Sequence, residues 1–308
     1  MLHISSLDEG LDLFKALGSD MRIQILKLLL ENKQMSMNQI AARLDITNGA
    51  LTGHIKKLEA CGLISTSSES ASHGNQKICT LCTNRILIDI ENEAEANQVC
   101  TTELKVGQFS DRSVYPTCGL ANSYSLIGEV DDARYFDHPG RFTADILWFT
   151  KGFVEYTVPN FIPLRHRILS ISISCEISSE APGCNEDWPS DIRFCINGTP
   201  VGCWTCPGDF GAERGILNPD WWPTNWNQHG LLKLLVINKS GTHIDGLKIS
   251  DVTIDDLNLQ PGKPIRFRME VNEEIHHPGG LTIYGRSFGN YGQDIRVSLA
   301  YGPIDPQS

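Results

Sequence analysis

The spacing of apolar residues changes near residue 90 of this 308-residue chain. Before that point apolar side chains recur every three or four residues, which is the spacing of an amphipathic helix. After it, short runs rich in β-branched and aromatic residues alternate with clusters of Gly, Pro, Asn and Asp, as in antiparallel strands and their turns. We therefore expect two domains of different secondary structure, the first at residues 1–90.

Four helices and a β-hairpin are predicted in the first domain. Apolar periodicity and flanking signals place the first three helices at residues 8–17, 19–30 and 36–44, and the fourth from residue 47 to a stop at Gly62. Ser36 caps the third helix and Thr47 opens the fourth. The segments LISTSSE and QKICTL then read as two strands joined by the polar tip SASHGN. This order predicts a helix-turn-helix followed by a wing.

The segments ALGSDMRIQILKLLL and MNQIAARLDITNGALTGHIKKLEACGLI resemble the ArsR-like (arsenic-repressor) family of winged-helix regulators. The resemblance covers a quarter to a third of the chain. It implies that the fourth helix lies in the DNA major groove, with Leu51, Ile55 and Leu58 facing inward. It also implies a homodimer that places two such helices in successive major grooves about 34 Å apart. The expected partner is double-stranded DNA with an inverted-repeat operator.

The polar residues of the helix-turn-helix and wing are the candidate DNA contacts. Short polar side chains on the recognition helix can read base edges, and lysines contact phosphates. Asn48 and Thr52 are the candidates for reading bases. The full set is Ser36, Gln39, Thr47, Asn48, Thr52, His54, Lys56, Lys57, His73 and Lys77. The alternative is that these residues only solvate a helix face. The order of helix, turn, helix and wing favours DNA binding.

No metal site or cofactor is predicted. Metal-sensing members of the resembled family often carry paired cysteines in the first helix of the pair, whereas SMNQIAARLD contains neither Cys nor His. Cys79 with Cys82 and Cys203 with Cys206 form two C-x-x-C pairs, which can hold zinc. The first pair lies in a predicted strand, where positions i and i+3 face opposite ways. We expect all ten cysteines to be reduced thiols rather than disulfides or zinc ligands.

The formal net charge of −11 is unevenly distributed along the chain. Residues 1–90 carry nine acidic and nine basic side chains, so the whole excess lies after residue 90. An acidic domain repels phosphates, so the two halves are expected to have different partners. The chain has no apolar run of membrane-spanning length, and its start, MLHISSLDEG, does not resemble a signal peptide. These features predict a cytoplasmic protein that does not contact membranes.

The second half is predicted to be a β-domain. The acidic segment at residues 91–115 is interpreted as a linker or short helix. The strand-like runs after it predict an antiparallel, jelly-roll-like β-sandwich at residues 116–308. The expected fold class is therefore α+β multidomain, a winged helix-turn-helix followed by an antiparallel β-sandwich.

Five of the six tryptophans fall between Trp188 and Trp226, in a segment otherwise made of loop residues. An indole face can stack on a sugar ring, whose hydroxyl groups need polar partners. The predicted effector is a small polar molecule, a carbohydrate. Its candidate ligands are Trp204, Asp209, Trp221, Trp222, Asn225, Trp226, Asn227 and His229. Two alternatives stay open: the tryptophans only pack the loop, or they contact a protein partner.

An enzyme is the main alternative to a regulator. The acids Glu155, Glu176, Asp187 and Asp191 could supply a glycosidase-like pair, but the sequence gives no separation between them. His276 and His277 could bind a metal, yet adjacent residues of a strand face opposite ways. No nucleophile elbow, HExxH, Walker A or dinucleotide-binding motif is present. We expect a ligand-responsive regulator without catalytic residues. An enzyme domain fused to a DNA reader, and a sandwich used only for oligomerisation, remain open.

Overall fold

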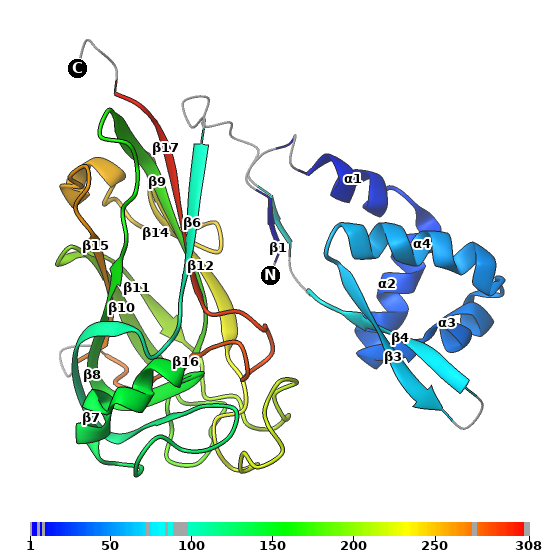
Figure 1. The fold of residues 1–308 in the computed structure, drawn as a ribbon, viewed down its shortest axis with the longest axis horizontal. Helices are drawn as coiled ribbons and strands as arrows, with labels where there is room; N and C mark the ends of the chain where they lie inside the picture. Colours follow the sequence, from blue (N-terminus) through cyan, green and yellow to red (C-terminus); the bar gives the residue numbers. More distant parts are fainter. Residues whose placement is uncertain are drawn as a thin grey trace. The chain divides into compact units, whose positions relative to one another are not determined.

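The computed structural model describes residues 2–4, 7, 10–71, 74–83, 86–88, 98–272 and 276–304. The chain divides into two compact units, residues Met1–Glu93 and Ala94–Ser308. A winged helix-turn-helix forms the first unit and a large antiparallel sheet the second (Figure 1), which confirms the expected α+β class. Among the described helices, none is both long and apolar enough to cross a membrane.

The first unit contains the expected helices and wing. The helices are α1 (Leu11–Leu17), α2 (Asp20–Asn32), α3 (Met37–Leu44) and α4 (Asn48–Ala60). The wing is the antiparallel pair β3 (Ile64–Ala71) and β4 (Gly74–Leu81), and β2 (Gln34–Ser36) extends it by pairing with β4. Strands β1 (Leu2–Ile4) and β5 (Ile86–Ile88) form a short parallel pair.

A single apolar core fixes the helices of this unit. Ile25 and Leu29 of α2, Ile40 of α3, and Leu51 and Leu58 of α4 are fully buried in it. Each such side chain contributes about 1.5–3 kcal/mol when it is removed from water. The inward face of α4 is therefore set by packing, which leaves its opposite face to solvent.

The described residues of the second unit form a 12-stranded antiparallel sheet. Its strands are β6 (Gln98–Leu104), β7 (Phe109–Ala121), β8 (Ile146–Val158), β9 (His166–Ser178), β10 (Ser190–Ile196), β11 (Thr199–Cys206), β12 (Leu231–Asn238), β13 (Gly241–Ile244), β14 (Leu247–Ser250), β15 (Ile265–Val271), β16 (Leu281–Tyr284) and β17 (Ile295–Pro303). Short 3-10 helices η1 (Ala133–Asp137), η2 (Pro139–Thr143) and η3 (Ile254–Leu257) lie between them. The jelly-roll order of strands remains a prediction.

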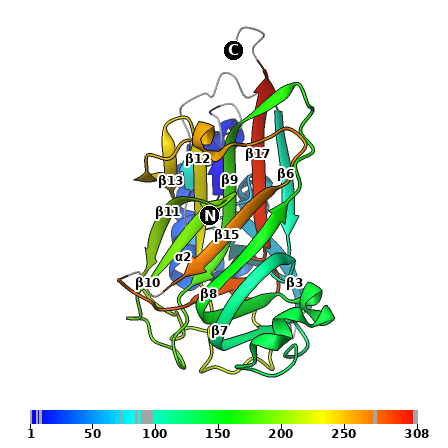
Figure 2. The same cartoon turned by 90° about the vertical axis from the view of Figure 1, so that its left-hand side faces the viewer.

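Strand β16 joins the two halves of this sheet. It pairs with β8 on one side and with β9 on the other. On the β8 side, β7 and β15 both pair with β8, and β10 and β11 follow β15. On the β9 side, β17 and β12 both pair with β9; β6 pairs with β17, and β13 and β14 follow β12. The sheet bends back on itself (Figure 2), and Leu147 and Phe149 of β8 share one core with Ile173 and Ile177 of β9.

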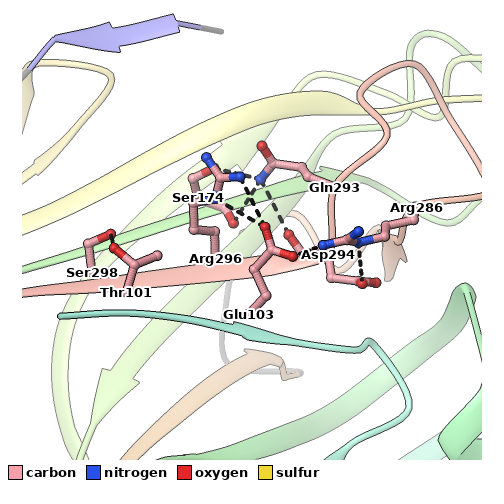
Figure 3. Close-up of polar contacts among 8 residues, drawn as sticks. All are labelled: Thr101, Glu103, Ser174, Arg286, Gln293, Asp294, Arg296 and Ser298. Carbon is pink, nitrogen blue, oxygen red and sulfur yellow. Dashed lines mark hydrogen bonds and ion pairs between the residues drawn. The ribbon is translucent and has the colours of Figure 1, made fainter.

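The expected linker or short helix at residues 91–115 is wrong in its second part, because β6 and the first half of β7 are strands of the sheet. Residues 91–97 lie outside the described part of the chain. Glu103 of β6 pairs with Arg286 and with Arg296 of β17, where Nη2 lies 3.0 Å from Oε1 (Figure 3). Among the described strands, β6 pairs with β17 alone. It carries mostly polar residues, so its sequence lacks the apolar alternation of a half-buried strand.

Candidate functional site

Helix α4 presents a polar face to solvent. Leu51, Ile55 and Leu58 are buried, whereas Thr52 and Lys56 are exposed on the opposite side. This separation follows from the helical period, because positions three and four residues apart share a face. The buried and exposed faces of α4 are thus those that the sequence predicts.

Asn48 connects the two helices of the helix-turn-helix. Its Nδ2 donates a hydrogen bond of 2.8 Å to Asn38 Oδ1 on α3. Its backbone carbonyl accepts a hydrogen bond of 2.7 Å from Thr52 Oγ1. All three residues are exposed, so these bonds hold their polar groups in place at the surface. Side chains that are already ordered lose less conformational entropy when a partner binds to them.

A surface hollow of about 250 Å³ lies between the start of the two helices and the wing. Its lining consists of Met37, Asn38, Asn48, Thr52, Gln76 and Lys77. The lining combines side-chain amides, a hydroxyl group and an ammonium group. Such groups bind phosphate oxygens and base edges. The structure therefore brings three predicted DNA contacts, Asn48, Thr52 and Lys77, into one site.

Ser36 is not available as a side-chain contact to DNA. It is buried, and its Oγ accepts a hydrogen bond of 3.2 Å from the Gln39 backbone N–H. The Gln39 Oε1 in turn accepts one of 2.8 Å from the Ser36 backbone N–H. This reciprocal pair is a capping box, which uses the acceptor oxygens of both side chains at the start of α3. The assignment of Ser36 as a DNA contact is therefore corrected.

The other predicted contacts differ in position. Thr47 is exposed, and its Oγ1 caps α4 by accepting a hydrogen bond of 3.2 Å from the Ala50 N–H. His54 is half-buried; burial, and next the positive charge of Arg22, lower its pKa. Its ring therefore borders the outward face rather than standing on it. Lys57 and Lys77 are exposed, and His73 lies outside the described residues.

Asn38 and Gln76 are not among the DNA contacts that the sequence predicts. Both line the hollow, one from the first turn of α3 and the other from β4. The only signal for Asn38 was a polar residue two positions after the N-cap. Its bond to Asn48 spans ten residues and exists only once the two helices have packed.

Trp222 is part of the interior of the sheet domain. It is 1% exposed, and its ring centroid lies 5.8 Å from that of Trp148, 5.0 Å from that of Trp226 and 4.9 Å from that of Phe288. Its Nε1 donates a hydrogen bond of 2.9 Å to the Asn227 carbonyl. Since other side chains enclose the ring, its assignment as a sugar-binding platform is wrong.

Asp209 and Asn227 are also buried, so they cannot orient a ligand at the surface. The Asn227 Nδ2 donates to Glu180 and, at 2.5 Å, to Thr282 Oγ1. The Asp209 Oδ2 accepts a hydrogen bond of 3.4 Å from the Ala181 N–H. Within the described residues its Oδ1 has no hydrogen-bond partner. The assignment of both residues as ligand contacts is corrected.

The remaining candidates fall into two groups. Trp204, Trp226 and His229 are half-buried. The Lys233 Nζ lies 4.4 Å from the Trp204 ring centroid, and the His229 ring is stacked on that of Phe210 at 5.5 Å. Within the predicted ligand set, the exposed residues are Trp221 and Asn225.

The acids considered for catalysis are held by separate partners. Glu155 on β8 pairs with Arg268, whose Nη2 lies 2.9 Å from its Oε2. Asp191 on β10 accepts a hydrogen bond of 2.6 Å from Thr205 Oγ1 and contacts His277 at 3.3 Å. Asp187 is exposed. No described group of three His, Cys, Asp or Glu side chains is arranged to hold a metal ion, and all ten cysteines are free thiols.

Several carboxyl groups are buried in the described part of the sheet domain, and three of them have a strongly raised pKa. Burial raises the pKa of Glu176 to about 8, that of Glu180 to about 7 and that of Asp209 to about 8. Glu176 accepts hydrogen bonds from backbone N–H groups, among them that of Gly230 at 2.9 Å, and Glu180 accepts one of 3.0 Å from Thr117 Oγ1. The negative charge of Glu180 contributes further to the raised pKa of Asp209.

Because the pKa values of these three carboxyl groups are raised, we expect the sheet domain to lose stability as pH rises from about 5 to about 8. Because their pKa values in the folded protein exceed those of the unfolded chain, the native state holds protons that the unfolded chain has released. The free energy of unfolding therefore falls across this range. The measurement is urea unfolding at a series of pH values. Asp209→Asn should flatten the dependence and the exposed Asp220→Asn should leave it unchanged; a wild-type free energy that rises with pH would contradict the assignment.

The first unit is similar to known proteins. A family model described as winged helix-turn-helix DNA-binding matches residues 19–65. An uncharacterized protein of Methanocaldococcus jannaschii is 33% identical over 78 residues, which are 25% of this chain and 84% of that protein. The transcriptional activator HlyU of Vibrio cholerae is 36% identical over 58 residues, 19% of this chain and 53% of HlyU. The match thus spans about half of HlyU.

The sheet domain has a distant structural neighbour. The CBM36-1 domain of a multidomain xylanase from the hindgut metagenome of Trinervitermes trinervoides aligns over 67% of this chain and 100% of its own length. The sequence identity is 8% and the TM-score is 0.30. A likeness at this level carries no inference about the fold or ligand of the sheet domain.

Proposed function

The N-terminal unit belongs to the winged helix-turn-helix DNA-binding proteins, and on this premise we propose that the chain is a transcriptional regulator of the ArsR-like type that binds an operator as a homodimer. One observation carries the proposal. The hollow between α3, α4 and β4 gathers side-chain amides, a hydroxyl group and a lysine from three separate segments at the surface. DNA recognition needs this combination of base-reading and phosphate-binding groups.

In this proposal the outward face of α4 enters the major groove. Asn48 has an amide that can bond an adenine edge at two points, and the Thr52 hydroxyl can serve as donor or acceptor. Lys56, Lys57 and Lys77 are exposed and would neutralise phosphates. A dimer with two such helices fits an inverted repeat with half-sites about one helical turn apart.

The sheet domain is proposed to bind a small polar effector, a carbohydrate, without catalysing a reaction. Its negative charge makes it a poor partner for nucleic acid. Trp221 and Asn225 offer an exposed aromatic ring and an exposed amide close together in sequence. Both functions are proposed to operate in the cytoplasm.

The test is an effect of a carbohydrate on operator affinity. Operator sequences are first selected from random DNA with the full-length protein, and affinity is then measured with and without cello-, xylo- and malto-oligosaccharides. One class should change operator affinity by about 5- to 150-fold, because a coupling free energy is typically about 1–3 kcal/mol. Affinity for scrambled DNA is the control. If every class leaves operator affinity unchanged, the carbohydrate part of the proposal fails.

A further inference from the structure

In the sheet domain, a hydrogen bond connects two distant segments that each carry an exposed aromatic side chain. Tyr124 is 84% exposed and Trp221 is 36% exposed. The Trp221 Nε1 donates a hydrogen bond of 2.9 Å to the carbonyl of Ser123, the residue before Tyr124. The fold therefore places Trp221 against the residue before Tyr124, although Tyr124 and Trp221 are 97 positions apart in the sequence.

The Trp221 ring packs against a buried tryptophan. Its centroid lies 5.5 Å from that of buried Trp222, with the two ring planes at 81°. The indole N–H of Trp221 is bonded to the Ser123 carbonyl. The part of the side chain that remains available to a ligand is therefore its apolar ring surface. An indole fixed in this way loses little conformational entropy when a ligand stacks on it.

Tyr124 stands at the tip of a tight turn. The Asn122 Oδ1 accepts hydrogen bonds from the backbone N–H groups of Tyr124 and Ser125, at 2.9 and 3.0 Å. The Asn122 Nδ2 donates a hydrogen bond of 3.1 Å to Thr143 Oγ1, which ties the turn to η2. This side-chain bonding fixes the backbone that presents the Tyr124 ring to solvent.

The polar sequence neighbours of Trp221 and the charge of the domain indicate a class of ligand. Asp220, Thr224 and Asn225 are exposed beside Trp221 in the sequence and supply a carboxylate, a hydroxyl and an amide. The chain after residue 90 carries the entire net charge of −11, which disfavours an anionic ligand. A neutral sugar has both flat CH-rich faces for the rings and hydroxyl groups for the polar neighbours.

We infer that Tyr124 and Trp221 form one stacking site for the pyranose rings of a neutral oligosaccharide. This site rests on the proposed carbohydrate-sensing function and gives it a place in the molecule. Trp222 supports the Trp221 ring there, and Trp226 packs against Trp222.

The test is calorimetric titration of full-length protein with hexasaccharides of β-1,4-glucose, β-1,4-xylose and α-1,4-glucose. At least one should bind, and Tyr124→Ala and Trp221→Ala should each weaken its binding by about fivefold or more. Tyr124→Phe should retain binding because the ring remains. Tyr115→Ala is the matched control, since Tyr115 is a 51% exposed tyrosine on β7. Circular dichroism and operator affinity without sugar show whether each variant is folded.

The outcomes separate the site from the function. Binding that survives both alanine substitutions overturns the site and leaves carbohydrate sensing standing. If none of the hexasaccharides binds the wild-type protein, both the site and carbohydrate sensing are overturned, whereas DNA binding is unaffected. Equal weakening by Tyr115→Ala would also overturn the site, because the loss would then be nonspecific.

Discussion

Replacing Trp222 with alanine is expected to lower the free energy of unfolding of the sheet domain by about 3–5 kcal/mol. The substitution leaves a large cavity among Trp148, Trp226, Tyr284 and Phe288. It also removes the edge-to-face ring contacts, each worth about 0.5–1.5 kcal/mol beyond the area they bury. The measurement is urea unfolding followed by circular dichroism.

Trp221→Ala is the matched control for this prediction. Trp221 is its neighbour in sequence but is exposed, so we expect a loss of about 1 kcal/mol or less. A similar small loss for Trp222→Ala would show that its ring is not part of the core. That result would reopen its role as a ligand platform.

Asn48→Ala is expected to weaken specific DNA binding by about 1–3 kcal/mol, or roughly 5- to 150-fold. The substitution removes the amide that is proposed to read a base edge, together with its bond to Asn38. Thr52→Ala should have an effect of similar size. Lys56→Ala should instead weaken binding to all sequences alike and reduce the salt slope by about 1. Affinities for operator and scrambled DNA at several salt concentrations distinguish the two kinds of contact.

Asn32→Ala serves as the matched control for Asn48→Ala. Asn32 is an exposed asparagine of the same unit, at the end of α2, where its side chain donates to the Leu28 carbonyl. It should leave operator affinity unchanged. An Asn48→Ala protein that discriminates operator from scrambled DNA as well as the wild type does would remove Asn48 from base reading.

The sequence predicted the helices of the first unit because their signals are local. The expected starts at residues 36 and 47 lie one residue before those of α3 and α4, since each helix begins directly after its cap. The buried positions Leu51, Ile55 and Leu58 follow from their spacing on α4. Each of these features depends on residues within two helical turns of one another.

Features that depend on distant residues could not be predicted. The burial of Trp222 requires Trp148 and Phe288, which lie far away in the sequence. A tryptophan that packs a loop and one that binds a sugar have the same local pattern. Strand β6 was missed for a related reason, because its hydrogen-bonding partner β17 is almost at the other end of the chain.

The most direct test of the central claim is the ratio of affinities for selected and scrambled DNA. The full-length protein is used to select sequences from random DNA, and both dissociation constants are measured at the same near-physiological salt concentration. We predict an inverted repeat bound about a thousandfold or more tightly than scrambled DNA, with the preference reduced by Asn48→Ala. Failure to enrich any sequence, or equal affinity for selected and scrambled DNA, would contradict the assignment of α4 and the hollow beside it as a sequence-reading site.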